Sequence, residues 1–170
     1  MRLIILGAGG YGRTVADVAS QSGRYAQIRF LDDKGDVSQW LGRCADFPHF
    51  KDEETEMIPA FGDNELRLKW MDRLSDAGIR QPTLIHKTAY LSPTVSLAEG
   101  TVILPHATVN TGCRIERGCI VNCGAIIDHD CVLEEGVHIC LGTIIKGGNR
   151  IPRCMKIEAG IIVTNGVYPL

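Results

Sequence analysis

The densest group of side chains suited to chemistry is Asp128-His129-Asp130-Cys131. A histidine flanked by two carboxylates fits general base catalysis, because one carboxylate can orient the imidazole while the other raises its basicity. A further histidine, His138, follows nearby after Gly136-Val137. The alternative interpretation is that these polar side chains only face solvent and have no catalytic role.

A second candidate site lies near the N-terminus, where the apolar run 3–6 leads into Gly7-Ala8-Gly9-Gly10-Tyr11-Gly12 and then into a predicted helix. Gly7, Gly9 and Gly12 satisfy the G-x-G-x-x-G pattern, whose backbone amides and helix N-terminus can face a phosphate. Asp32 ends a predicted strand and lies 20 residues after Gly12, where a ribose-binding carboxylate is expected. The alternative is that the glycines only let the helix and strand pack closely.

The length of this first part favours a mononucleotide over a dinucleotide. A dinucleotide site needs two mononucleotide-binding halves, and only about 80 residues precede the region described next. We therefore predict half a Rossmann fold, suited to the nucleoside diphosphate of an activated sugar. A further strand–turn–helix step through Gly62-Asp63-Asn64 is expected to place that turn beside the same crevice.

The elements that must position His129 are predicted by a six-residue repeat. Every sixth residue from Leu91 to Val163 is aliphatic, at thirteen consecutive positions, and neither a helix nor a simple strand has this period. The repeat is typical of a triangular parallel β-helix, in which each hexad forms one side and 18 residues complete a coil. Glycine recurs three residues after the aliphatic position, at a corner with unusual torsions. Small residues recur two residues before it, in a second inward position. At the corner position, glycine is replaced by His106, Asp130 and Cys154.

Composition divides the chain into residues 1–82, with mixed helical and strand patterns, and residues 83–170, rich in Gly, Ile, Val and Cys. The predicted fold class is an α/β half-Rossmann domain followed by an all-β parallel β-helix. A net charge of −2 gives no reason to expect nucleic acid or an anionic membrane as partner. The apolar start is too short for a signal peptide, and no run reaches the ~18–20 residues of a membrane span, so a cytoplasmic location is predicted.

Metal binding is not predicted. His106, His129 and His138 are spaced 23 and 9 residues apart, and neither interval is a multiple of the 18-residue coil. The seven cysteines contain no CxxC pair. Cys113 and its equivalents Cys119 and Cys131 occupy the small inward position, where we expect them to pack as small apolar groups.

In combination, these motifs resemble the left-handed β-helix sugar acetyltransferases of the NeuD type. That group contains sialic acid O-acetyltransferases and N-acetyltransferases of UDP-4-amino sugars. The resemblance covers nearly the whole chain, through Gly7-Ala8-Gly9-Gly10-Tyr11-Gly12, Phe30-Leu31-Asp32-Asp33, Gly62-Asp63-Asn64-Glu65-Leu66-Arg67, Leu84-Ile85-His86-Lys87-Thr88-Ala89, Val121-Asn122, Ile127-Asp128-His129-Asp130-Cys131 and Gly136-Val137-His138.

The resemblance implies a left-handed coil, a homotrimer with active sites between adjacent prisms, and direct transfer from acetyl-CoA to a nucleotide sugar without an acetyl-cysteine. It implies that His129 is the catalytic base and that Asp130 orients it. The residues implied near the acetyl group and CoA are Asn122, His138, Gly142 and Gly147. Those implied to bind the nucleotide sugar are Gly7, Gly9, Gly10, Tyr11, Gly12, Asp32, Asp33 and Asn64.

The sequence departs from this family in two places. Tyr11 occupies a loop position often held by histidine. Relatives usually continue for about another coil after the region matching Gly147-Gly148-Asn149, and that coil forms much of the CoA groove, whereas this sequence ends at Leu170. One alternative is therefore a trimeric nucleotide-sugar-binding protein without acyltransferase activity, and another is a metal-dependent β-helix enzyme. Amine and hydroxyl acceptors both stay open.

Overall fold

The structure, a computed structural model, describes residues 1–35 and 38–170. The chain divides into two compact units, Met1–Pro82 and Thr83–Leu170. Within the described residues, neither α-helix is long and apolar enough to cross a membrane.

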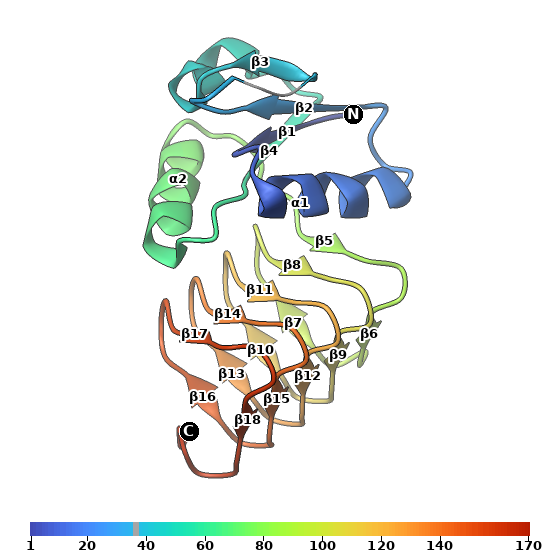
Figure 1. Ribbon diagram of the computed structural model, residues 1–170, viewed down its shortest axis with the longest axis vertical. Coiled ribbons are helices and arrows are strands. Elements are labelled where there is room, and N and C mark those ends of the chain that lie inside the picture. The colour runs from blue at the N-terminus through green and yellow to red at the C-terminus, as the bar shows by residue number, and fades with distance from the viewer. Residues whose placement is uncertain (36–37) are drawn as a thin grey trace. The chain divides into compact units, whose positions relative to one another are not determined.

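The first unit is built on a four-stranded parallel sheet with the strand order β3-β2-β1-β4 (Figure 1). Its elements are β1 (Arg2–Leu6), α1 (Gly10–Gln21), β2 (Gln27–Leu31), β3 (Trp40–Gly42), a 3₁₀ helix (Cys44–Phe50), β4 (Thr55–Pro59) and α2 (Asn64–Asp76). Ile4 and Leu6 of the buried strand β1 share a core with Trp70 and Leu74 of α2. Because β1 and β4 are neighbours, the glycine loop and the turn before α2 both leave the sheet at the same carboxyl edge.

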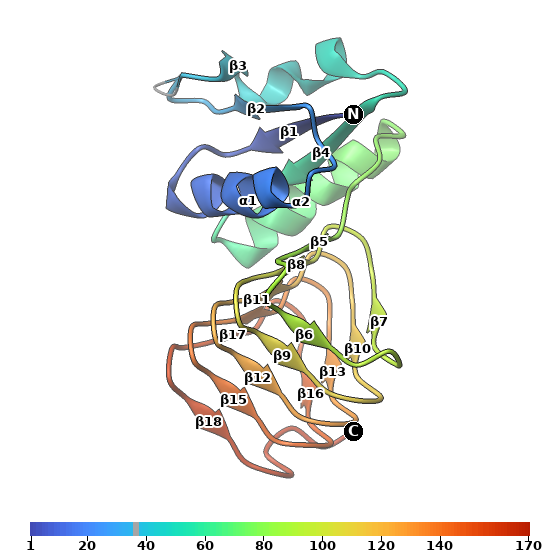
Figure 2. The ribbon, with the colours of Figure 1, turned by 90° about the vertical axis from the view of Figure 1, so that its right-hand side faces the viewer.

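The second unit is a parallel β-helix of two-residue strands, which form the three sides of a prism (Figures 1 and 2). The first side holds β5 (Leu84–Ile85), β8 (Val102–Ile103), β11 (Ile120–Val121), β14 (His138–Ile139) and β17 (Lys156–Ile157). The second side holds β6 (Tyr90–Leu91), β9 (Thr108–Val109), β12 (Ile126–Ile127), β15 (Ile144–Ile145) and β18 (Ile162–Val163). The third side holds β7 (Ser96–Leu97), β10 (Arg114–Ile115), β13 (Val132–Leu133) and β16 (Arg150–Ile151).

Each strand pairs in parallel with the strand 18 residues away, so the predicted coil length is confirmed. The aliphatic positions from Ile103 to Val163 form the buried core of the prism, as predicted. The prism begins before Leu91, the first position of the aliphatic repeat, since β5 already pairs with β8.

The corners of the prism explain the recurring glycine. The first corner (104–107, 122–125, 140–143) joins the first side to the second, the second corner (110–113, 128–131, 146–149) joins the second side to the third, and the third corner (116–119, 134–137, 152–155) completes the coil. Corner glycines adopt positive φ, as Gly124 does at 67°. His106, Asp130 and Cys154 adopt the same conformation, with φ of 59°, 57° and 56°. A residue with a Cβ is strained in this region, so a side chain at position 130 costs some stability. Aspartate tolerates the region better than most such residues.

Candidate active site

The predicted catalytic pair lies on the second corner, on the solvent side of the prism. Nδ1 of His129 and Oδ2 of Asp130 are 2.8 Å apart, and the two side chains are 56% and 64% exposed. Because the carboxylate can only accept, Nδ1 carries the proton and the lone pair of Nε2 is available as a base. The hydrogen bond with Asp130, followed by the charge of Asp128, raises the pKa of His129 above its ordinary value.

Asp128, the residue before His129, is held by contacts with the backbone and with two side chains. Its Oδ1 accepts hydrogen bonds from the backbone N–H of His129 at 3.0 Å and from Nδ2 of Asn110 at 3.3 Å. Its Oδ2 lies 3.4 Å from Nζ of Lys146. The backbone N–H of His129 lowers the pKa of Asp128 most, and Asn110 and Lys146 lower it further. Asp128 therefore stays ionised and adds negative charge beside His129, while Asp130 orients the ring.

Two glycines make room for the pair in the neighbouring coils. A Cβ on Gly147 would lie 2.7 Å from both Cε1 and Nε2 of His129. A Cβ on Gly112 would clash with Oδ1 of Asp130. Gly147 thus lies against the basic edge of the imidazole, and any larger residue would displace the ring.

The other residues predicted to lie near the acetyl group are on a different corner. Asn122 and Gly142 belong to the first corner, and His138 is the outward residue of β14 on the first side. Nδ2 of Asn122 donates to Nε2 of His138 at 3.3 Å. The second side of the prism separates this group from His129, so one chain brings the predicted residues together in two groups rather than one.

The predicted nucleotide pocket lies at the carboxyl edge of the N-terminal sheet. It has a volume of about 330 Å³, and its lining residues are Ala8, Gly9, Arg13, Asp32, Asp33, Lys34, Cys44 and Phe61. Helix α1 begins after Gly9, which provides no side-chain cap for the first-turn amides. The amides at this N-terminus, together with the cations of Arg13 and Lys34, favour an anionic ligand.

The glycines of the loop divide into two kinds. A Cβ on Gly12 would clash with the carbonyl oxygen of Gly7, and Gly7 itself has a φ of 102°, so these two glycines are required for helix–strand packing. A Cβ on Gly9 or Gly10 would meet nothing within 4 Å. The packing interpretation therefore accounts for Gly7 and Gly12, while Gly9 and Gly10 leave open space at the start of α1. Tyr11, at the next position of α1, is partly exposed.

Asp32 and Asp33 shape the walls of this pocket through the backbone. Oδ2 of Asp32 accepts from the N–H of Ala8 at 2.8 Å, and Oδ1 accepts from the N–H of Lys34 at 2.8 Å. Oδ1 of Asp33 accepts from the N–H of Cys44 at 3.0 Å. Burial raises the pKa of the Cys44 thiol to about 12, so this cysteine lines the pocket as a neutral thiol. A ribose contact by Asp32 stays a prediction.

Asn64 begins α2 and is not among the residues that line the pocket. Its Oδ1 accepts from Nη2 of Arg67 at 2.8 Å, and Nη1 of Arg67 donates to the carbonyl oxygen of Phe61 at 2.9 Å. Arg67 is 1% exposed, and the sequence assigned it no role. This buried guanidinium fixes the turn that brings Phe61 to the pocket.

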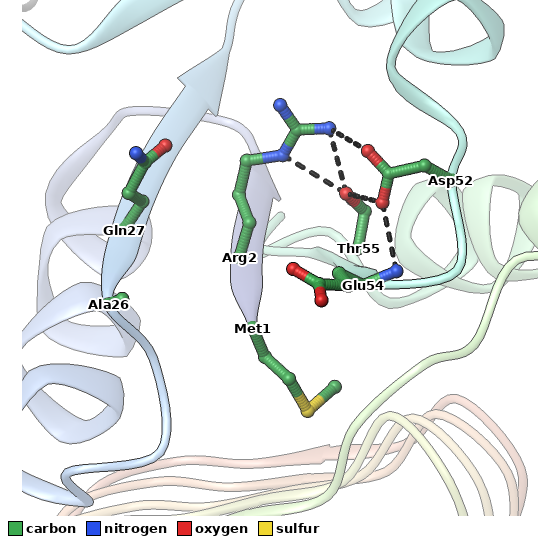
Figure 3. A pocket seen from close by; sticks show the side chains of 7 residues that line it. All are labelled: Met1, Arg2, Ala26, Gln27, Asp52, Glu54 and Thr55. Carbon is green, nitrogen blue, oxygen red and sulfur yellow. Dashed lines mark hydrogen bonds and ion pairs between the residues drawn. The ribbon is translucent and has the colours of Figure 1, made fainter.

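A further cavity lies at the amino ends of the strands, and contacts that hold the sheet together surround it (Figure 3). Arg2 donates to Oδ2 of Asp52 at 2.7 Å and to Oγ1 of Thr55 at 2.8 Å, which ties the start of β1 to the start of β4. The hydrogen bond from Thr55, and then the charge of Arg2, lowers the pKa of Asp52. Ligands of parallel α/β sheets bind at the carboxyl ends of the strands, and this cavity lies at the amino ends.

The three histidines considered for metal binding occupy separate places: His106 on the first corner, His129 on the second, and His138 on the first side. Among the residues that the structure describes, no three His, Cys, Asp or Glu side chains are grouped so as to hold a metal ion.

The chain thus joins a half-Rossmann unit with an open glycine loop to a hexapeptide β-helix with a histidine–aspartate pair on one corner. Comparison with known proteins shows which family has this architecture. Residues 2–74 match the PglD N-terminal domain. The acetyltransferase domain of PglB from Neisseria gonorrhoeae is 34% identical, with a TM-score of 0.91 over 95% of this chain and 81% of that chain. A second structure of that domain contains acetyl coenzyme A.

Two more distant structures share the fold. PerB from Caulobacter crescentus, solved with CoA and GDP-perosamine, is 24% identical, with a TM-score of 0.86 over 100% of this chain and 92% of that chain. WeeI from Acinetobacter baumannii is 19% identical, with a TM-score of 0.74 over 95% of this chain and 88% of that chain. The chain therefore belongs to the hexapeptide-repeat sugar acetyltransferases, and its β-helix is left-handed. The narrower NeuD-type assignment stays a prediction.

Proposed function

We propose that this acetyltransferase moves the acetyl group of acetyl-CoA to the amine of a nucleotide-activated amino sugar, with His129 as general base. The observation that carries the proposal is the exposed His129–Asp130 pair, whose free Nε2 lies over Gly147. The related PglB domain binds acetyl-CoA, and PerB binds CoA together with a nucleotide sugar. We place the reaction in the cytoplasm, where both substrates are made.

The proposed chemistry needs a single base. The neutral sugar amine attacks the thioester carbonyl, and Nε2 of His129 accepts the proton that the nitrogen loses. Backbone N–H groups stabilise the oxyanion of the tetrahedral intermediate. As the C–S bond breaks, the CoA thiolate takes the proton from His129, which restores the neutral imidazole. A raised pKa helps His129 to hold the proton between these two steps.

The nucleotide sugar is proposed to bind through its diphosphate at the start of α1. Gly9 and Gly10 leave space there, and Arg13 and Lys34 supply positive charge. Asp32 and Asp33 are proposed to contact the ribose and base side of the ligand, in addition to the backbone contacts that they make in the free pocket. Tyr11 and Asn64 remain proposed contacts at the rim.

The separation of the two site groups supports the proposed homotrimer. Asn122, His138 and Gly142 are proposed to bind the acetyl end of CoA, yet the second side of the prism lies between them and His129. A second copy packed along this side can present its first-corner group to His129. The side suits such packing, because its outward residues Tyr90, Ile126 and Ile162 are 56%, 39% and 59% exposed.

The third side has the opposite character. Its outward arginines are paired with glutamates, Arg114 with Glu116 at 3.5 Å and Arg150 with Glu134 at 2.6 Å. Such charged, paired side chains are typical of a solvated face, whereas an exposed apolar stripe is typical of an interface. We therefore propose that trimer contacts use the second side.

The activity test uses the full chain with acetyl-CoA and UDP-, GDP- or CMP-linked amino sugars, and mass spectrometry detects the acetylated product. His129→Ala is expected to lower kcat by about 10²–10⁴-fold. His106→Gly is the matched control, because it removes another exposed corner histidine and restores the residue usual at that corner; it should retain activity. Near-normal turnover by His129→Ala would refute the assignment. Calorimetric binding of nucleotide sugar without binding of acetyl-CoA would favour the inactive binding protein instead.

A further inference from the structure

Polar side chains at the small inward position of the β-helix make a recurring hydrogen bond. A side-chain donor at this position binds the backbone carbonyl 15 residues later, at the next coil's corner. The donors are Thr83, Thr101, Cys113, Cys119, Cys131, Thr143 and Asn149, and their acceptors are the carbonyls of Ala98, Glu116, Asp128, Glu134, Lys146, Glu158 and Thr164. Cysteine at this position therefore acts as a donor as well as a small apolar group.

One of these bonds reaches the candidate catalytic corner. Sγ of Cys113 lies 3.0 Å from the carbonyl oxygen of Asp128, and the cysteine is 1% exposed. That carbonyl belongs to the peptide that joins Asp128 to His129. Burial disfavours the charged thiolate, so the Cys113 thiol keeps its single proton and can donate it to this carbonyl.

Two further hydrogen bonds hold this corner. The N–H of the Asp128–His129 peptide donates to Oδ1 of Asp128, and the carbonyl of the following peptide, that of His129, accepts from the N–H of Gly148 at 3.1 Å. In this arrangement the imidazole reaches Asp130 and fits over Gly147. Loss of the inward bond would leave this part-buried carbonyl without its donor, and that cost favours a shift of the corner.

We infer that Cys113 is a positioning residue, whose thiol holds the Asp128–His129 peptide so that the imidazole is aligned for proton transfer. The inference rests on the proposed function of His129. It assigns Cys113 no contact with either substrate.

The test compares two nearly isosteric replacements, Cys113→Thr and Cys113→Val, of which only threonine keeps a donor. The fold accepts both residues at this position, since Thr101 and Thr143 occupy it in some coils and Val95 and Val137 in others. Cys119→Thr and Cys119→Val are the matched controls. Cys119 also donates, at 3.1 Å, to a carbonyl 15 residues later, that of Glu134 on the third corner, which carries no candidate site residue; that carbonyl accepts from the N–H of Val137 as well, at 3.2 Å.

We expect Cys113→Val to lower kcat about tenfold with KM for both substrates within twofold of wild type, because a small misalignment of a catalytic group costs one to two orders of magnitude. Cys113→Thr should lie within about threefold of wild type, and the two Cys119 variants should not differ. The pH at half-maximal kcat should also move in Cys113→Val only, since the histidine–aspartate contact changes. The imidazole titration of His129, followed by NMR, reports the same change where activity is too low to measure.

Equal kinetics and equal His129 titration for Cys113→Val and Cys113→Thr would overturn the inference while leaving His129 as the base. Equal losses in Cys113→Val and Cys119→Val would also overturn it, because they would indicate a general effect on the prism. An inactive wild-type protein, or a fully active His129→Ala variant, would overturn the proposed function itself and the inference with it.

Discussion

Replacement of Gly147 by alanine should disturb the alignment of His129 without destabilising the fold. The added Cβ would lie 2.7 Å from Nε2 and Cε1 of His129, against a normal contact of 3.4 Å or more. The ring must therefore move by about 0.7 Å, the difference between these two distances, or rotate away from Asp130. Since 1 Å of misplacement costs up to about 10²-fold, we expect kcat to fall about 10- to 100-fold.

The same substitution should not weaken the fold. Gly147 does not adopt the positive φ that marks the corner glycines, so alanine is compatible with its backbone. Replacing glycine at such a position reduces the entropy of the unfolded chain and contributes about 0.4–1 kcal/mol of stability, as long as the exposed imidazole can give way. Urea unfolding measures this directly, and steady-state kinetics with acetyl-CoA and an amino-sugar nucleotide measure kcat.

A double-mutant cycle provides the control. If Gly147→Ala acts by displacing the imidazole, it should have almost no further effect in a His129→Ala background. The reasoning is refuted if Gly147→Ala lowers kcat by the same factor whether or not His129 is present, or if the single variant keeps wild-type activity with the imidazole unmoved.

Three further predictions follow from the second corner and the second side. Asp130→Gly should lower kcat by about tenfold or more, because His129 loses the carboxylate that orients it. The variant should still unfold at the same or a higher urea concentration, because glycine relieves the strain of a φ of 57°. Cys154→Gly, which relieves a φ of 56° on the third corner, should gain stability without losing activity. The base must be neutral and its pKa is raised, so kcat/KM should fall with decreasing pH around a midpoint above the ordinary histidine value of about 6.5, and Asp130→Gly should move this midpoint to lower pH. If the proposed trimer packs along the second side, Ile126→Glu should yield monomers in analytical ultracentrifugation and abolish activity in kinetic assays, whereas Ser96→Glu on the third side should do neither.

The repeat made most of the β-helix predictable. An aliphatic residue at every sixth position is typical of a three-sided parallel coil, although the period does not fix the hand of that coil, and the glycine phase located the corners because positive φ selects glycine. The same logic drew attention to Asp130, where the glycine is replaced. The prism continues through β16, β17 and β18, although Asn149 and Met155 depart from the small-residue pattern. Asn149 fits because its buried side chain donates to the carbonyls of Lys146 and Thr164.

The N-terminal unit was predictable where burial leaves a strong pattern. The strands 3–6 and 27–31 and the helices after the glycine loop and after Asp63 lie where they were expected. Strand β3 and the 3₁₀ helix Cys44–Phe50 were missed, because a three-residue strand and a seven-residue 3₁₀ helix are specified by tertiary contacts rather than by periodicity. The bond from Trp40 to the carbonyl of Asp32 is one such contact.

The site residues were harder to predict as a group than one by one. The sequence singled out both His129 and Asn122, and their different corners could have been read from the 18-residue coil, since a seven-residue separation crosses one side. The roles of Gly147 and Cys113 depend on contacts between coils, namely a Cβ-sized space and a thiol–carbonyl bond. The repeat places Cys113 in the small inward phase but does not show that its thiol donates to the candidate corner, and Gly147 lies outside the phase of the corner glycines.

The most direct test of the proposed reaction is a crystal structure of the protein with CoA and a nucleotide-linked amino sugar. We predict that the sugar amine lies within about 3.2 Å of Nε2 of His129. We also predict that the CoA sulfur lies between His129 of one copy and the Asn122–His138 pair of another. A sugar amine bound away from His129, or a CoA sulfur bound at a different corner of the prism, would contradict the proposed mechanism.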